Sequence, residues 1–131
     1  MFLVAEDSTL SLPLNIKICD NFFTRLVGAL RRGYVRRGEA YLFPGCSWPH
    51  TWFMRRAISI LFYDQEGKIV EFYPSVPPFR FLKPVAAAGM IELNHRRLTR
   101  EEVAKFKYIR FSRKVSARLQ NPVLRFSSEG G

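Results

Sequence analysis

Acidic residues, cysteines and long apolar runs are all scarce in this sequence. Only 11 of its 131 residues are Asp or Glu, against 21 Lys or Arg, so the formal net charge is +10. Two cysteines, Cys19 and Cys46, are too few for a disulfide framework. No apolar run approaches the roughly 18 residues of a membrane span, and Glu6 and Asp7 lie where a signal peptide would be basic or apolar. We therefore expect a cytoplasmic protein that has no disulfide framework and does not enter a membrane.

Apolar and aromatic side chains are abundant enough to build one core. They make up 47% and 15% of the chain, and the aromatic set includes 12 Phe. A chain of this length can bury roughly 65 to 70% of its extended surface. We expect a single domain over residues 1–131, with a basic extension at 112–131 that ends in a mobile tail.

The apolar pattern in the first part of the chain predicts a strand followed by a helix. Apolar residues alternate from Leu10 to Ile18, as in a strand with one buried face, and Pro13 favours an edge or bulged position. Asp20 then precedes apolar residues at helical spacing up to Leu30. This order predicts a helix packed on a sheet.

Further along the chain the pattern indicates short strands and turns. Ala57–Tyr63 and Lys68–Tyr73 flank an acidic turn that ends in Gly67, which predicts a hairpin. Thr99 and Glu102 match a capping box that opens a short helix. The remaining expected segments are short strands at Tyr41–Phe43, Met90–Leu93 and Tyr108–Phe111, and a proline-rich surface connection over residues 74–84. The expected fold class is α+β and mainly β: a small barrel-like sheet, antiparallel or mixed, with one or two packed helices.

Arginine dominates the positive charge and is concentrated in two segments. Guanidinium groups bind phosphate and carboxylate bidentately, so a surface that faces a polyanion is one interpretation, and nucleic acid is the commonest such partner. The alternative is a solvated basic face, because no nucleic-acid motif accompanies the charge. The candidate nucleic-acid residues are Arg31, Arg32, Arg36, Arg37, Arg96 and Arg97.

Several short motifs resemble one known family. Cys46, His50, Thr51 and Met54 form a C-x3-H-T-x-x-M element before a predicted strand. An earlier element with Arg25, Gly28 and Leu30, the turn from Asp64 to Gly67, and the pair Glu92–Leu93 follow the same order. Together they are similar to the family called domain of unknown function 192, over roughly residues 10–111. The resemblance implies a small, mainly β domain with a few helices, and the family has no established biochemical activity.

The sequence departs from the family pattern at two places. Ser59 stands where the pattern has an Asp, so an activity that requires this carboxylate would be lost. The Gly expected shortly after Glu92 is missing from the segment Asn94–Arg97. Both departures lie close to the motifs that carry the resemblance.

The rare residue types near His50 predict a binding site with apolar walls and a few polar groups. Trp52 and Met54 would form the walls, and His50 and Arg25 the polar contacts. An ion pair between Arg25 and Glu92 is the structural alternative. The full set of expected ligand-binding residues is Arg25, Cys46, His50, Trp52, Met54 and Glu92. The partner would be a small anionic ligand or a protein, and we expect no cofactor.

Chemistry at Cys46 and His50 is a further alternative. The two side chains could act as nucleophile and base in a small hydrolase or transferase, or as two metal ligands. A catalytic thiolate also needs a group that orients its imidazole, and the obvious position for one carries Ser59. We therefore expect no catalytic residue and no metal ligand.

Alternation across residues 51–62 places an arginine on each face of the predicted strand. Arg56 shares a face with Ile58 and Ile60, whereas Arg55 shares the other face with Ser59. An unpaired buried guanidinium costs several kcal/mol. At least one of the two arginines must therefore reach solvent, a carboxylate or a ligand.

Overall fold

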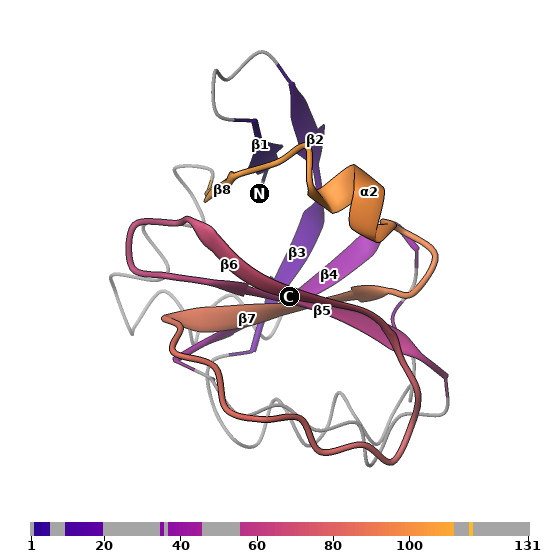
Figure 1. Cartoon of the computed structure of the whole chain (residues 1–131). Helices are drawn as coiled ribbons and strands as arrows, with labels where there is room; N and C mark the ends of the chain where they lie inside the picture. The colour runs from indigo at the N-terminus through magenta and orange to yellow at the C-terminus, as the bar shows by residue number, and fades with distance from the viewer. Residues whose placement is uncertain are drawn as a thin grey trace.

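The structure is a computed structural model that describes residues 2–5, 10–19, 35, 37–45, 56–111 and 116. Strands dominate this part of the chain, and a single short helix, α2, is described (Figure 1). The elements are β1 (Phe2–Val4), β2 (Ser11–Pro13), β3 (Asn15–Ile18), β4 (Glu39–Pro44), β5 (Ile58–Tyr63), β6 (Ile69–Val76), β7 (Gly89–Asn94), α2 (Arg100–Val103) and β8 (Tyr108–Arg110). The mainly β α+β class predicted from the sequence is confirmed.

The strands form two sheets. The smaller has the order β2-β1-β8, and the larger has the order β3-β4-β7-β5-β6. β3 pairs with β4 in parallel, while the other pairings are antiparallel, so the larger sheet is mixed. The expected barrel-like closure is wrong, because β3 and β6 are the two edges of the larger sheet and do not pair with each other. An isolated bridge between Lys68 and Tyr108 links the two sheets.

The alternating run from Leu10 to Ile18 divides into two strands. β2 pairs with β1, whereas β3 pairs with β4, and buried Leu14 lies between them. Pro13 ends β2 at the edge of the smaller sheet, where its missing N–H removes no ladder hydrogen bond from a central strand. The edge position predicted for Pro13 is confirmed, while the single continuous strand is not.

The hairpin of β5 and β6 closes through an Asp–Gly turn. The Asp64 carboxylate accepts hydrogen bonds from the backbone N–H groups of Glu66 and Lys68, both at 2.9 Å. Gly67 has a φ of 81°, and a Cβ there would come within 2.9 Å of the Ile109 carbonyl oxygen. The Ile109 N–H donates back to the Gly67 carbonyl at 2.7 Å. The predicted hairpin is confirmed, and its turn also contacts β8.

A bulge interrupts the pairing of β5 with β6. Ile58 pairs with Val76 and Ile60 with Tyr73, so Pro74 and Ser75 lie opposite the single residue Ser59. The Ser59 hydroxyl accepts a hydrogen bond from the Ser75 N–H at 3.1 Å, and Ser75 has a φ of 51°. The sequence predicted that a surface connection begins at Pro74, but strand β6 continues through this residue. An edge strand such as β6 tolerates a proline, because a missing N–H there removes no ladder hydrogen bond from a central strand.

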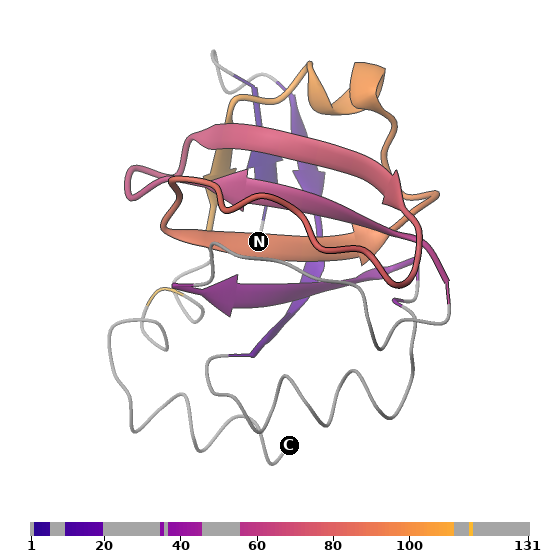
Figure 2. The same ribbon diagram turned by 60° about the horizontal axis from the view of Figure 1, so that its bottom comes forward.

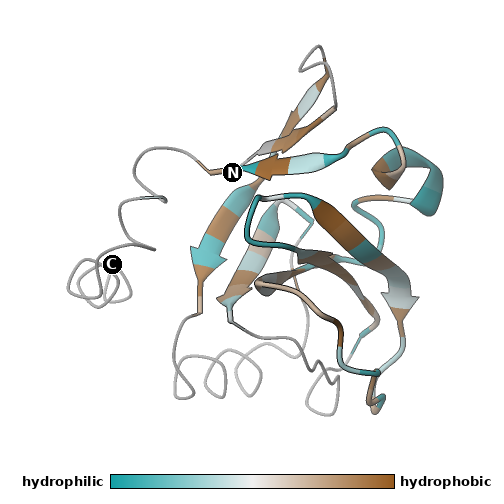
Figure 3. Cartoon of the chain, turned by 60° about the vertical axis from the view of Figure 1, so that its left-hand side comes forward, coloured by the Kyte–Doolittle hydropathy of each residue, from teal (hydrophilic) through white to brown (hydrophobic). Residues whose placement is uncertain are grey.

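The larger sheet is covered on both faces. One face packs against the smaller sheet and α2 through a first-face cluster that includes Leu61, Leu93, Leu3, Ile109 and Val103. The other face carries a second-face cluster that includes Ile60, Phe62, Met90 and Phe43, with Leu82, Val85 and Ala87 of the β6–β7 connection packed against it. Every residue of β5 is buried for this reason. Figure 3 shows apolar colour along the strands, whereas α2 is largely hydrophilic.

The chain leaves β7 through a turn that leads into α2. Thr99 caps the helix: its hydroxyl accepts from the Glu102 N–H at 3.1 Å, and the Glu102 carboxylate accepts from the Thr99 N–H at 3.1 Å. The predicted capping box is confirmed, although the helix ends at Val103. Among the described residues no helix has both the length and the apolar character needed to cross a bilayer.

Candidate functional site

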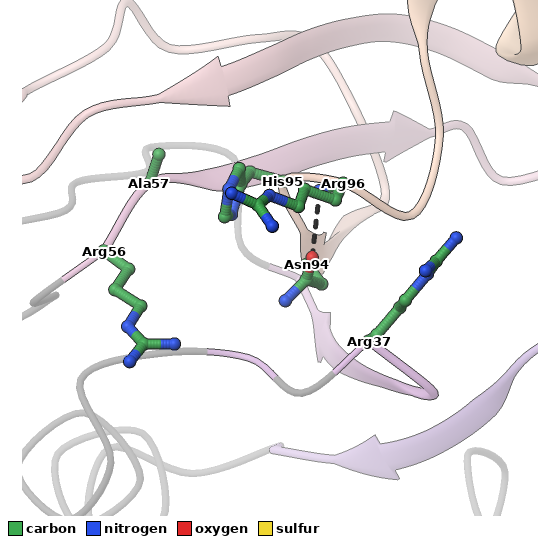
Figure 4. A pocket seen from close by; sticks show the side chains of 6 residues that line it. All are labelled: Arg37, Arg56, Ala57, Asn94, His95 and Arg96. Carbon is green, nitrogen blue, oxygen red and sulfur yellow. Dashed lines mark hydrogen bonds between the residues drawn. The ribbon is translucent and has the colours of Figure 1, made fainter.

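A hollow of about 580 Å³ opens at the end of β7. The described residues that line it are Arg37, Arg56, Ala57, Asn94, His95 and Arg96, and we call this site the Arg–His pocket (Figure 4). Its volume lies in the range of about 300 to 1,000 Å³ that is typical of small-molecule sites.

Strand order explains why these residues meet. β7 lies between β4 and β5 and runs antiparallel to both, so its end lies between their starts. Asn94 pairs with Ile58, which brings Ala57 and Arg56 to one side of the pocket. Leu93 pairs with Ala40, which brings Arg37 to the other side. Figure 4 shows the Arg56 and Arg37 side chains on either side of Asn94.

Asn94 organises the base of the pocket. Its amide nitrogen donates to the Val35 carbonyl at 2.6 Å, and its amide oxygen accepts from the Arg96 N–H at 2.9 Å. The Asn94 carbonyl also accepts from the Arg97 N–H at 2.9 Å, which closes a turn over residues 94–97. Buried Leu98 and the cap at Thr99 follow directly. The turn that carries His95 and Arg96 is therefore anchored at both ends.

The pocket is strongly cationic. Arg37, Arg56 and Arg96 are exposed, and no carboxylate is among the described residues that line the hollow. The Nδ1 atom of His95 is buried and has no hydrogen-bond partner in the described structure. A buried polar atom without a partner costs about 1–3 kcal/mol, and such atoms are rare in native proteins. The three guanidinium groups, which carry only hydrogen-bond donors, favour an anionic group that accepts hydrogen bonds.

Glu92 lies two residues before Asn94 on β7, so both side chains are on the same face of the strand. It is 8% exposed and pairs with Tyr41 on β4 and Ile60 on β5. Burial raises the pKa of its carboxyl from 4.5 to about 7, because the charged form loses its hydration. Glu92 is therefore an interior group in this structure, and its predicted roles as a ligand contact or as the partner of Arg25 stay predictions.

The structure describes only part of the predicted sites. Arg37 and Arg96 come together in the Arg–His pocket, and Arg97 follows them in the turn, half-buried. The predicted residues Arg25, Cys46, His50, Trp52, Met54, Arg31, Arg32 and Arg36 lie outside the described residues. No group of three or more potential metal ligands comes together in the described ranges.

Four lining residues of the pocket, Arg56, Ala57, Asn94 and His95, were not predicted as site residues from the sequence. At least one of Arg55 and Arg56 was expected to reach solvent, a carboxylate or a ligand. Arg56 is exposed at the pocket, but it was not assigned to a site. Asn94 and His95 lie where the family pattern expects a Gly that this chain lacks. The missing Gly was the signal in the sequence that this turn carries side chains that line a pocket. A Gly has no side chain, whereas the side chain of Asn94 forms the base of the pocket.

Ser59, the other departure from the family pattern, has a structural role. Its side chain is fully buried and holds the bulge of β6 through the Ser75 N–H. It faces the first-face cluster, together with Leu61 and Leu93. A serine here supplies a hydrogen-bond acceptor without burying a charge.

Comparison with known proteins identifies the family. The sequence profile of DUF192, described as "Uncharacterized ACR", matches residues 3–111. The chain belongs to the DUF192 family. The match begins within β1, before the region covered by the motifs, and it ends just after β8. No curated protein matches the chain.

Two solved structures share the fold. A protein described as a proposed transcription regulator, from Sinorhizobium meliloti 1021, aligns with a TM-score of 0.66 and 18% identity, over 82% of this chain and 88% of its own. A protein of unknown function from Novosphingobium aromaticivorans DSM 12444 aligns with a TM-score of 0.68 and 11% identity, over 84% of this chain and 82% of its own. At these identities the likeness shows the DUF192 fold alone.

Proposed function

We propose that this DUF192 protein is a non-catalytic binding module for a small anionic ligand, which the Arg–His pocket holds. The observation that carries the proposal is that three arginines and one histidine line one hollow of about 580 Å³. A bound anion would interact favourably with the positive charge of the side chains that line this concave site. The net charge of +10 adds a long-range attraction for such a ligand.

Phosphate and carboxylate groups suit this pocket best. A guanidinium presents parallel N–H donors that match two oxygens of either group, and such charge-assisted hydrogen bonds are stronger than neutral ones. Arg37 lies just before β4 and Arg96 just after β7, so two separate segments supply guanidinium donors to the lining of the pocket. The fixed turn at Asn94 limits the conformational entropy lost on binding.

Binding of pyrophosphate and citrate, followed by amide NMR shifts, tests the proposal. We expect shifts centred on Arg37 and on residues 94–97. Arg96→Ala should weaken pyrophosphate binding by about tenfold or more, because it removes charge-assisted hydrogen bonds. Arg110→Ala is the matched control, since Arg110 is exposed on β8 and is not among the lining residues.

The result separates specific binding from general attraction. Equal loss of affinity in both arginine variants would show that net charge alone attracts the anion, and the proposal would then be wrong. Absence of shifts at the pocket with either anion would also contradict it. A preference for one of the two anions identifies whether phosphate or carboxylate is the recognised group.

The predicted site around His50 is tested in the same titration. His50→Ala and Trp52→Ala should weaken anion binding if these residues belong to the ligand site. Met54 stands two positions before Arg56 in the sequence, and Arg56 lines the pocket. Unchanged affinity in both variants would separate the His50 hypothesis from the proposed pocket.

The alternative chemistry at Cys46 and His50 has its own test. Cys19 is 5% exposed, so alkylation of the folded protein should report chiefly on Cys46. A thiol activated by an imidazole reacts as a thiolate well below the ordinary thiol pKa of about 8.5. Alkylation that follows a thiol pKa near 8.5 would exclude the hydrolase or transferase hypothesis.

A further inference from the structure

Two phenylalanines project from the connection between β6 and β7. In the segment Pro77–Pro84, which we call the aromatic loop, Phe79 is 62% exposed and Phe81 is 66% exposed. By contrast, Phe62 and Phe72 in the strands are at most 5% exposed. Large aromatic side chains normally contribute to stability through burial. Phe79 and Phe81, two residues apart, instead present apolar ring surface at the exterior of the protein.

The aromatic loop is anchored to the rest of the protein. Leu82 packs against the second-face cluster, and so does Val85 just beyond the loop. Phe79 has a φ of 61°, in the left-handed region that an aromatic residue seldom adopts. Pro77 and Pro78 restrict the backbone that leads to it. The loop therefore presents both rings from a constrained backbone, which lowers the entropic cost of binding.

The charge of the aromatic loop is entirely positive. Arg80 lies between the two phenylalanines and Lys83 follows them, and both are exposed. The sequence contains no acidic residue between Glu71 and Glu92. A partner that presents flat apolar groups together with negative charge is complementary to this surface.

The aromatic loop begins beside the Arg–His pocket. Val76, the last residue of β6, pairs with Ile58, and Ile58 pairs with Asn94 of the pocket. Phe79 is three residues beyond Val76, so its Cα lies within about 10 Å of the Val76 Cα. Figures 1 and 2 both show the start of the loop beside the start of β5. One extended ligand can therefore reach both sites.

We propose that the anion recognised by the Arg–His pocket is a phosphate of single-stranded nucleic acid, and that Phe79 and Phe81 stack on its bases. This inference rests on the proposed function, because the pocket itself would bind a single phosphate group, and it names the larger molecule that carries this group. Single-stranded sites combine a cationic groove with exposed aromatic rings in this way. Arg80 and Lys83 would contact the neighbouring phosphates.

A single strand fits these features better than a duplex or a bilayer does. Duplex bases stack on one another and hide their faces from the two rings. A flat bilayer presents its phosphates in a plane, whereas the arginines of the pocket line a hollow. A flexible strand can place one phosphate in the hollow and its next bases on the loop.

Fluorescence anisotropy with a labelled oligothymidine of about 12 nucleotides tests the inference. At about 50 mM salt we expect binding that a duplex of similar length does not match. Phe79→Ala and Phe81→Ala should each weaken binding by at least about fivefold, the loss of one stacked base. Val70→Ala is the matched control, because Val70 is 40% exposed on β6, outside the loop and the pocket. Thermal unfolding of each variant verifies that it folds.

The outcomes separate this inference from the proposed function. Pyrophosphate shifts at the pocket without oligothymidine binding would overturn the inference and leave the binding module intact. Failure of both ligands would overturn both proposals. Equal affinity in the Phe79→Ala, Phe81→Ala and Val70→Ala proteins would show attraction by charge alone and would also overturn it. Phe-dependent binding to phosphatidylserine vesicles, with no binding of oligothymidine, would identify a membrane surface as the partner instead.

Discussion

At the scale of single residues, the buried carboxyl of Glu92 should make stability depend on pH. Its pKa rises from 4.5 to about 7 on folding, so between these values the folded protein holds a proton that the unfolded chain has released. Stability should therefore fall as the pH rises from about 4.5 to about 7. The contribution of this group is on the order of 3 kcal/mol.

Glu92→Gln should remove this dependence, because the amide stays neutral. We expect the variant to gain stability over the parent at pH 8 and to differ little at pH 4.5, as measured by urea unfolding. Glu66→Gln is the control, since Glu66 is exposed in the hairpin turn. The assignment fails if parent and Glu92→Gln lose the same stability between these pH values.

Gly89 is required by close packing at the start of β7. A Cβ at this position would come within 2.7 Å of Tyr63 Cζ and 2.9 Å of the Phe43 carbonyl oxygen. Gly89→Ala should cost about 1–3 kcal/mol of unfolding free energy, because the backbone of β4 cannot move aside freely. The Tyr63 hydroxyl is also in contact, so the cost should be smaller in a Tyr63→Phe background. A cost that is identical in both backgrounds would contradict the contact with Tyr63.

At the scale of elements, the turn from Asn94 to Arg97 connects stability to the pocket. Asn94→Ala removes the donor to the buried Val35 carbonyl and the acceptor of the Arg96 N–H. We expect a loss of about 2–3 kcal/mol in chemical unfolding and weaker pyrophosphate binding. Asn94→Asp keeps the acceptor but brings a negative charge to the pocket, so it should weaken anion binding further. Pyrophosphate affinity unchanged in both variants would remove Asn94 from the site.

The helix that follows this turn depends on its cap. Thr99→Ala removes the side-chain acceptor of the Glu102 N–H and should cost about 1 kcal/mol. Thr99→Ser retains the hydroxyl and should cost much less. Urea midpoints of the two variants measure the difference, and equal midpoints would show that the capping box contributes nothing here.

At the scale of the whole molecule, the charge of +10 sets how binding responds to salt. A single strand that contacts the cations of the pocket and of the aromatic loop, Arg37, Arg56, Arg96, Arg80 and Lys83, should show a slope of about −3.5 in log Kobs against log salt. A clearly steeper slope would indicate that the other predicted basic residues, such as Arg31, Arg32, Arg36 and Arg97, take part. A slope near zero would exclude phosphate contacts altogether.

Local pattern was sufficient to predict several elements. The hairpin of β5 and β6 follows from β-branched runs around an Asp–Gly turn, and the cap at Thr99 follows from the spacing to Glu102, because both depend on hydrogen bonds between near neighbours. β1 was not predicted, since it is only three residues long and one of its two partners, β8, lies at the far end of the described chain. The prediction of a closed barrel was wrong because the pairing of strands that are distant in sequence leaves no signal in the local pattern.

Composition and local spacing by themselves determined the mainly β class, the family resemblance and the basic character of this protein. Only the tertiary structure decided that Arg37, Arg56 and His95 line one hollow, because antiparallel pairing of β7 with both β4 and β5 brings together residues up to 59 positions apart, as Asn94 and Val35 show. The proline pattern had already placed Phe79 and Phe81 in a surface connection, and the structure adds that their side chains are 62% and 66% exposed. Burial and strand pairing are properties of the whole fold, and no window of sequence contains them.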